Sequence, residues 1–438
     1  MSKKKNLQKY GIAIPSILLP KDKSKLKSWS VIACDQYTQD AAYWQNVENF
    51  VGDAPSSLHI TLPEIYLNAS DKNERIASIK NTMKKYIDEK LFEDEGGAFV
   101  YIERKTAYGR KRSGLVLAVD LECYEWKPFS QSLIRATEAT ILDRIPPRKE
   151  IRQNAAIETP HIMLLVDDPE KKLVEKLGEK TQTEAPLYQT DLMMDSGSIT
   201  AWKIHTEKQF TYIEETLAEL AQQNKQKDGS VFLFAVGDGN HSLATAKAVW
   251  DSYKTEQNLS DHPARYALVE IVNIYDAGLT FEPIHRVIFD IDGKELLAFC
   301  QKELGGEILF CENEAELTEA VESSSSNFGF VYNHEGKICY ALLKNKSETL
   351  AVSRLQPVLD SYLEIHAEKN PEIDYIHGND EVFRLGGKNA ATSILLPPIA
   401  KDSFFSSISN NGPLPRKSFS MGEASEKRFY MECRKLFS

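Results

Sequence analysis

The chain has 438 residues, of which 42% are hydrophobic and 27% are charged, as is usual for a folded globular protein. This composition excludes collagen-like, disulfide-dense and intrinsically disordered classes. The length favours two domains, because it exceeds what one hydrophobic core usually organises. The net charge of −11 opposes a surface built to follow nucleic-acid phosphates, so we expect no nucleic-acid partner.

Targeting and redox features are also informative. No apolar run reaches the length of a membrane span, and no apolar core of a signal peptide follows the charged first residues. The six cysteines form no C-x-x-C pair, and no three of the nine histidines fall at metal-ligand spacing. We therefore expect a cytoplasmic protein with reduced thiols, no membrane partner, and no zinc, haem or flavin. The oligomeric state stays open.

The first half of the chain alternates strand and helix patterns. Residues 72–91 carry apolar side chains at helical spacing between charges, which predicts an amphipathic helix. Residues 98–103 and 114–119 flank a connection rich in glycine and basic residues, which predicts a hairpin. A helix over 130–144 should stop at Pro146-Pro147, because proline lacks the donor that continuation needs. Other expected elements are helices at 41–51 and 171–180 and strands at 11–20, 29–34, 59–62, 161–166 and 199–204.

The second half continues the alternation, so we predict a mixed α/β (α+β) fold with mixed sheets and flanking helices. We expect an N-terminal α/β part over 1–262 and a C-terminal α/β part over 263–438, packed tightly on the first. The expected helices lie at 208–224, 242–253, 294–304, 314–322 and 358–367, and the strands at 231–236, 266–275, 283–289, 328–332, 338–342 and 391–396.

The stretch Gly237-Asp238-Gly239-Asn240-His241-Ser242 joins a predicted strand to a predicted helix. The first amides of a helix, backed by its dipole, bind phosphate or carboxylate, and glycine lets the backbone approach closely. The stretch departs from both G-x-G-x-x-G and the Walker A pattern, so it identifies neither a dinucleotide fold nor a P-loop. The alternative is an ordinary connection in which Asp238 or Asn240 caps the helix.

Several side chains are candidates for chemistry at this turn. Asp238 suits a magnesium ligand or an acceptor of a substrate hydroxyl proton, and His241 suits orienting or protonating a phosphoryl oxygen. Asp35 and Glu64 each follow a predicted short strand and are further carboxylate candidates. Guanidinium groups suit phosphate oxygens, although a solvated basic face is the alternative. The basic candidates around Pro146-Pro147 are Arg135, Arg144, Arg148, Lys149 and Arg152.

Over nearly its full length the sequence resembles a family called domain of unknown function one-thousand-and-fifteen. The resemblance rests on six short words spread along the chain. They are Ala33-Cys-Asp-Gln-Tyr-Thr38, Thr61-Leu-Pro-Glu64, Ile134-Arg-Ala-Thr137, Val236-Gly-Asp-Gly-Asn-His241, Ile284-His-Arg-Val287 and Pro415-Arg-Lys-Ser418.

The central word of that family is often Asp-Gly-His-His-Arg, which is similar to the phosphate-contacting motif of the ParB/sulfiredoxin-like superfamily that includes free serine kinases. Asp238, Gly239 and His241 match this motif, while Asn240 replaces its first histidine and Ser242 its arginine. The resemblance implies a ParB/sulfiredoxin-like nucleotide-binding core and a phosphotransferase that uses Mg²⁺ with ATP or ADP. Free L-serine is the leading acceptor.

The missing arginine removes a fixed cationic donor, so another basic residue must neutralise the phosphates if turnover is to survive. The alternative is a nucleotide- or phosphate-binding regulatory protein without turnover.

Overall fold

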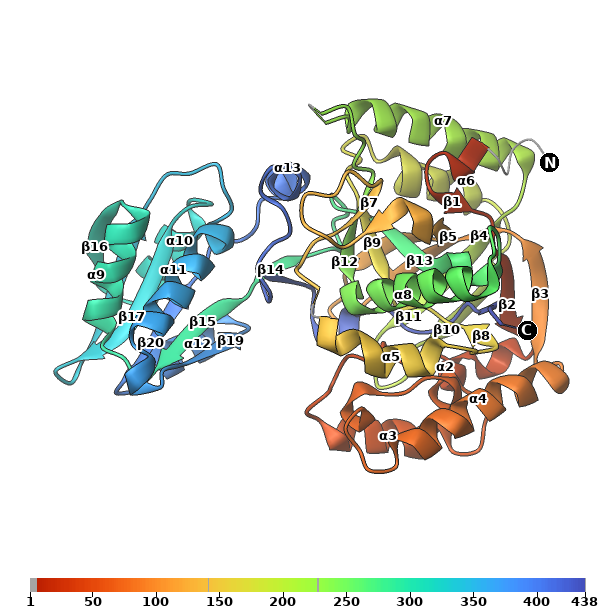
Figure 1. Ribbon diagram of the computed structural model, residues 1–438, viewed down its shortest axis with the longest axis horizontal. Helices are drawn as coiled ribbons and strands as arrows, with labels where there is room; N and C mark the ends of the chain where they lie inside the picture. Colours follow the sequence, from red (N-terminus) through yellow and green to blue (C-terminus); the bar gives the residue numbers. More distant parts are fainter. Residues whose placement is uncertain (1–5, 141, 227, 438) are drawn as a thin grey trace. The chain divides into compact units, whose positions relative to one another are not determined.

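The computed structural model describes residues 6–140, 142–226 and 228–437 (Figure 1). Contacts divide the chain into unit 1, Met1–Leu279 with Gly422–Ser438, and unit 2, Thr280–Met421. This division differs from the expected boundary at 262/263, because strand β13 (Tyr266–Asn273) pairs within the main sheet of unit 1. The chain also returns to unit 1 after unit 2. The expected mixed α/β class is confirmed.

Unit 1 is built on a sheet of ten strands among the described residues, in the order β10-β11-β4-β5-β13-β9-β12-β7-β6, with β1 on β5. The central strands are nearly continuous apolar runs, as expected for strands buried on both faces. The main-sheet strands are β1 (Ile12–Ala13), β4 (Phe99–Lys105), β5 (Lys111–Asp120), β6 (Tyr124–Glu125), β7 (Ile134–Ala136), β9 (Met163–Val166), β10 (Tyr188–Asp191), β11 (Ser198–Ile204), β12 (Phe234–Asp238) and β13.

Helices and two small sheets surround this main sheet (Figure 1). The helices are α2 (Leu26–Trp29), α3 (Ala41–Val51), α4 (Lys72–Asp88), α5 (Ile145–Arg152), α6 (Leu177–Thr181), α7 (Glu207–Gln223) and α8 (Asn240–Gln257). The small sheets pair β2 (Ser16–Pro20) with β3 (Phe92–Gly97), and β8 (Ile157–Glu158) with β22 (Arg434–Lys435). Helix α5 packs against α8, which brings Arg148 and Arg152 close to residues 237–242, which we call the glycine turn.

Three predicted elements are wrong. Trp29 ends α2, and Ser57–Ile60 is a 3₁₀ helix where a strand was expected at 59–62. The helix expected over 130–144 is replaced by β7 and a short 3₁₀ turn. The two prolines at 146 and 147 lie in the first turn of α5, where a missing N–H costs nothing, so they begin a helix instead of ending one.

Unit 2 contains a sheet in the order β16-β18-β17-β20-β15-β19 and a small pairing of β14 with β21. Within the described ranges of both units, none of the helices combines the length and apolar character that crossing a membrane requires. The strands of unit 2 are β14 (Phe281–Pro283), β15 (His285–Phe289), β16 (Glu307–Cys311), β17 (Phe328–His334), β18 (Lys337–Lys344), β19 (Glu372–Ile376), β20 (Ala391–Leu395) and β21 (Phe419–Met421), and its helices are α9 (Gly293–Leu304), α10 (Glu314–Glu322), α11 (Ala351–Ile365), α12 (Asn379–Gly386) and α13 (Lys401–Asn411).

Candidate functional site

The glycine turn joins β12 directly to α8, as the sequence predicted. The register of β12 against β9 shifts between Val236 and Asp238, so the strand bulges at Gly237. Gly239 then caps the helix with φ +79°, a left-handed conformation that favours glycine. A Cβ atom on Gly239 would lie 3.1 Å from two atoms of Ile162, so a larger residue would require Ile162 to move.

Gly239, the residue that caps α8, has no side chain to accept a hydrogen bond from the first turn. The Oδ1 atom of Asn240 accepts a hydrogen bond from the Thr137 amide at 3.3 Å, and its Nδ2 atom donates to Thr137 Oγ1 at 3.3 Å. The Oδ1 atom of Asp238 accepts from the Gly239 amide at 3.0 Å. The alternative of a helix capped by Asp238 or Asn240 is therefore not what the structure has, and neither side chain accepts a hydrogen bond from the first turn of α8 in the contacts described.

A lysine from the returning C-terminal segment reaches the same turn. The Nζ atom of Lys427 lies 3.4 Å from Oδ2 of Asp238. That oxygen is buried and, among the described residues, accepts no hydrogen bond. Lys427 is itself buried, with 8% of the residue exposed. The turn thus holds a carboxylate oxygen and a cation that are close together but not locked in a hydrogen bond.

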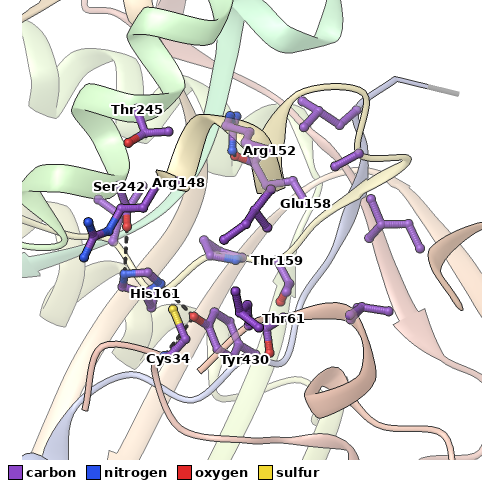
Figure 2. A pocket seen from close by; sticks show the side chains of 18 of the residues that line it. Cys34, Thr61, Arg148, Arg152, Glu158, Thr159, His161, Ser242, Thr245 and Tyr430 are labelled. Carbon is purple, nitrogen blue, oxygen red and sulfur yellow. Dashed lines mark hydrogen bonds and ion pairs between the residues drawn. The ribbon is translucent and has the colours of Figure 1, made fainter. Parts of the chain in front are cut away.

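A chain of hydrogen bonds runs from α8 to the C-terminal segment through His161. Ser242 Oγ lies 3.0 Å from His161 Nε2, and Tyr430 Oη lies 2.8 Å from His161 Nδ1 (Figure 2). The Cys34 amide donates to Tyr430 Oη at 3.0 Å. Which ring nitrogen of His161 carries the proton decides the direction of both imidazole bonds.

Asp35 is the second carboxylate near the turn, with Oδ2 3.8 Å from His161 Nε2. Burial raises the pKa of Asp35, but the nearby imidazole of His161, a hydrogen bond from Gln36 and the charge of Lys427 outweigh this effect and lower the pKa. Asp35 is therefore an anion at neutral pH, available to a cation or to a proton.

His241 is uncharged at neutral pH. Burial, followed by the nearby positive charges of Arg144 and Arg148, lowers the pKa of His241 to about 4, and Asp35 only partly offsets this. A neutral imidazole orients a phosphoryl oxygen as a hydrogen-bond donor but has no charge to contribute. We call the charged and imidazole side chains around the glycine turn the turn cluster: Asp35, Arg144, Arg148, His161, Asp238, His241 and Lys427.

Some of the predicted basic residues lie near the glycine turn and others do not. Arg148 pairs with Glu64, and the Nη1 atom of Arg152 pairs with Glu158 at 2.6 Å. Both arginines line a cavity of about 140 Å³ together with Ser242 (Figure 2). Arg144 is exposed and acts on His241 through its charge.

The structure does not bring Arg135 to the turn. Its Nε atom donates to the Ser132 carbonyl at 2.9 Å, and its Nη2 atom donates to Ser230 Oγ at 3.1 Å. Both partners precede the strands β7 and β12, whereas the turn follows β12. Its guanidinium also lies over the ring of Phe232, 4.6 Å from the centroid. The Lys149 side chain is likewise occupied, donating to Ser252 at 2.7 Å.

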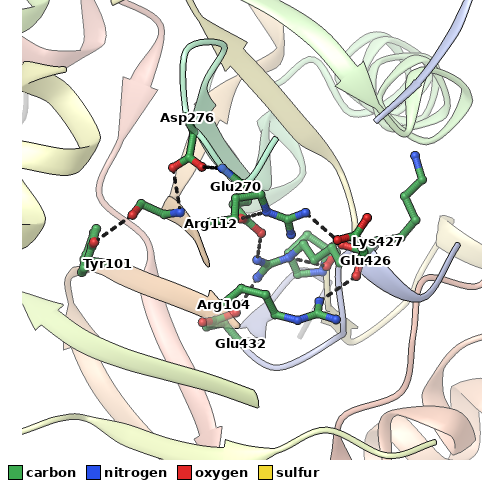
Figure 3. Close-up of polar contacts among 12 residues, drawn as sticks. Tyr101, Arg104, Arg112, Glu270, Asp276, Glu426, Lys427 and Glu432 are labelled. Atoms are coloured by element: carbon green, nitrogen blue, oxygen red, sulfur yellow. Dashed lines mark hydrogen bonds and ion pairs between the residues drawn. The ribbon is translucent and has the colours of Figure 1, made fainter. Parts of the chain in front are cut away.

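Buried ion pairs anchor the segment that supplies Lys427 and Tyr430 (Figure 3). Arg428 pairs with Glu270 and with Glu432, and all three residues are at most 2% exposed. Arg104 Nη1 donates to the Lys427 carbonyl at 2.9 Å. Breaking a buried pair by removing one partner is strongly destabilising, so this network fixes the backbone that presents Lys427.

The family described as protein of unknown function (DUF1015) matches residues 16–362 of this sequence. The chain belongs to this family. A search of curated proteins found no match.

Several solved structures are distantly similar to the DUF1015 chain. A free serine kinase in complex with AMP is 10% identical with a TM-score of 0.37, covering 72% of this chain and 90% of its own. A conserved hypothetical protein from Pyrococcus furiosus is 10% identical with a TM-score of 0.34, covering 73% and 94%. SbnI from Staphylococcus aureus, with a C-terminal truncation, is 7% identical with a TM-score of 0.36, covering 70% and 82%. Similarities at TM-scores this low do not assign the chain to a superfamily. The ParB/sulfiredoxin-like core therefore stays a prediction.

Sequence reasoning missed Lys427, Tyr430 and His161 as members of the site. His161 was placed at the start of a strand, and its position beside the turn follows from the pairing of β9 with β12. The two C-terminal residues reach the turn through long-range pairing, in which Ile32 bridges Phe429 and β22 pairs with β8. The sequence does show charged residues at 426–428 and 432. Their partners lie far away in the sequence, so the sequence did not indicate which residues they contact.

Proposed function

We propose that this protein is a phosphotransferase that binds the phosphates of ATP or ADP at the first turn of α8 and phosphorylates a small hydroxylated metabolite. The observation that carries the proposal is an uncapped helix N-terminus surrounded by the cations and carboxylates of the turn cluster. Phosphoryl transfer is catalysed mainly by positioning and by neutralising charge, and both are what such an arrangement offers.

Ser242 stands where the motif has an arginine, so the positive charge of that arginine is lost. We assign the replacement of this charge to Lys427. A lysine held beside Asp238 is a point charge for phosphate oxygens, though without the bidentate geometry of arginine. The exposed guanidinium of Arg144, whose charge acts on His241, adds a second cation. Together they replace the charge, but not the geometry, of the absent side chain.

The carboxylates have distinct tasks in this proposal. Asp238 accepts the proton of the acceptor hydroxyl or contributes an oxygen to Mg²⁺, since its Oδ2 atom is buried without a hydrogen bond among the described residues. Bound Mg²⁺ would neutralise phosphate charge. Proteins usually hold Mg²⁺ by one or two carboxylates together with phosphate oxygens of the substrate, and Asp238 is the carboxylate that we assign to it.

Free L-serine is the first acceptor to test, because the resemblance to free serine kinases names it. Asp35, an anion, and the cations Lys427 and Arg144 offer both signs of charge to a zwitterion. A second function is a nucleotide-responsive binding protein. The loss of the motif arginine favours it, since binding can survive where turnover does not.

The deciding experiment measures O-phosphoserine formed from L-serine with Mg²⁺ and either ATP or ADP. We compare the wild type with Asp238→Asn and with Asp88→Asn, a control at the exposed end of α4. We expect product from the wild type and the control, and a loss of about 10²–10⁴-fold in Asp238→Asn. Nucleotide that raises the melting temperature without any product would favour the binding protein. No thermal shift and no product would refute both functions.

A further inference from the structure

An apolar cavity adjoins the first turn of α8, and Ser242 belongs to both (Figure 2). Its volume is about 140 Å³, and its walls include Ile60, Leu62, Met83 and Ile151. We propose that this cavity holds the base and ribose of the donor nucleotide. The inference rests on the proposed function, because it takes the phosphates to lie on α8.

The charged groups in the wall are already neutralised. Arg148 pairs with Glu64, and Glu158 pairs with both Arg152 and Arg434. A zwitterionic acceptor in this cavity would lose its hydration without gaining an unpaired partner, and burying an uncompensated charge is expensive. A neutral heterocycle carries no such penalty, and contact with aliphatic walls stabilises it.

Three threonine hydroxyls of the wall favour hydrogen-bond donors on the ligand. Thr61 Oγ1 donates to the Ser57 carbonyl at 2.8 Å, Thr159 Oγ1 donates to the Glu432 carbonyl at 3.1 Å, and Thr245 Oγ1 donates to the His241 carbonyl at 2.7 Å. Their protons are committed to main-chain carbonyls, so they offer a ligand only acceptor lone pairs. Exocyclic amino groups and ribose hydroxyls are donors of the kind that fit.

The rest of the site leaves the acceptor a separate place. Asp35, Asp238, His241 and Lys427 do not line the cavity, whereas Ser242 and His161 do. The contact of 3.0 Å between Ser242 and His161 therefore lies where the cavity adjoins the turn cluster. A nucleotide with its phosphates on α8 extends its base into the cavity, and the acceptor binds among Asp35, Asp238 and Lys427, three members of the turn cluster that lie outside the lining.

The test compares ATP with inorganic tripolyphosphate, which has the phosphate chain but no nucleoside. Ala155 lines the cavity and is 3% exposed, so Ala155→Leu fills space that the base needs. Ile151→Phe on α5 is a second variant that fills the same cavity, and it serves if Ala155→Leu does not fold. The control is Ala156→Leu, at the next residue, which is equally buried but outside the cavity lining.

We measure both dissociation constants by isothermal titration calorimetry in the presence of Mg²⁺. We expect the cavity-filling variants to bind ATP at least about tenfold more weakly and tripolyphosphate within about twofold of the wild type. The control should bind both ligands as the wild type does.

Three results would overturn the inference in different ways. If the variants keep the wild-type affinity for ATP, the base does not occupy the cavity, although the proposed function stands. If they raise KM for serine and leave ATP binding unchanged, the cavity belongs to the acceptor. If the wild type binds neither ATP nor tripolyphosphate, the proposed function fails together with the inference.

Discussion

Replacing Gly239 by alanine tests the geometry of the glycine turn. The left-handed conformation of Gly239 costs alanine about 1–2 kcal/mol, and the new methyl group would lie 3.1 Å from two atoms of Ile162. Accommodating that overlap requires a shift of the segment before β9, and overpacking of this kind costs about 1–3 kcal/mol more. We therefore expect Gly239→Ala to lower the free energy of unfolding of unit 1 by about 2–5 kcal/mol.

Gly109 provides a matched control, because it has φ +75° in the turn between β4 and β5 and a methyl group added there would meet no described atom within 4 Å beyond its chain neighbours. Gly109→Ala should cost only the backbone part, about 1–2 kcal/mol. Urea unfolding followed by fluorescence measures both variants in the same unit. Nucleotide binding should fall in Gly239→Ala alone, because only that variant changes the residue that caps α8 and its contact with Ile162. Equal losses of stability in the two variants would refute the argument that Ile162 restricts this position.

The remaining predictions concern charged groups. Arg428→Met should destabilise unit 1 by about 3–5 kcal/mol in urea unfolding, because it leaves buried carboxylates unpaired, and a loss under about 1 kcal/mol would contradict the anchoring role. The pKa of His241 is lowered from 6.5 to about 4, so the stability it contributes is complete above pH 6.5 and disappears as the pH falls towards 4. In His241→Gln the melting temperature should depend less on pH between 4 and 6.5 than in the wild type. An unchanged pH dependence would count against the lowered pKa. Lys427→Met should weaken tripolyphosphate binding about tenfold while Arg135→Met leaves it unchanged, and the reverse order would mean that the phosphates bind elsewhere.

Local patterns predicted the framework of the turn well. The apolar residues at helical spacing over 72–91 predicted helix α4. The apolar run at 231–236, followed by residues of high helix propensity at 242–253, predicted β12 and α8. These elements are set by neighbours in the sequence, so periodicity suffices to find them. The prolines at 146 and 147 led to a wrong prediction, because proline both ends helices and begins them.

The composition of the site was harder to predict because it depends on distant segments. Lys427 and Tyr430 reach the turn after the chain has left unit 1, formed unit 2 and returned. Arg135 was expected at the turn because it is close to Arg144 and Arg148 in sequence, but it lies in β7, and its guanidinium contacts residues at the opposite end of β7 and β12. Proximity in sequence is a poor guide to proximity in space once a strand intervenes.

The return of the chain into unit 1 also has a consequence for biosynthesis. Residues up to Leu279 leave the ribosome without the segment Gly422–Ser438 that contributes Lys427 and Tyr430. The buried carboxylate of Glu270 cannot form its ion pair with Arg428 until all of unit 2 has been translated. A growing polypeptide therefore carries an incomplete turn cluster throughout most of its synthesis, and a product that terminates within unit 2 lacks Lys427 and Tyr430. The order in which the polypeptide is made thus determines when the turn cluster can form.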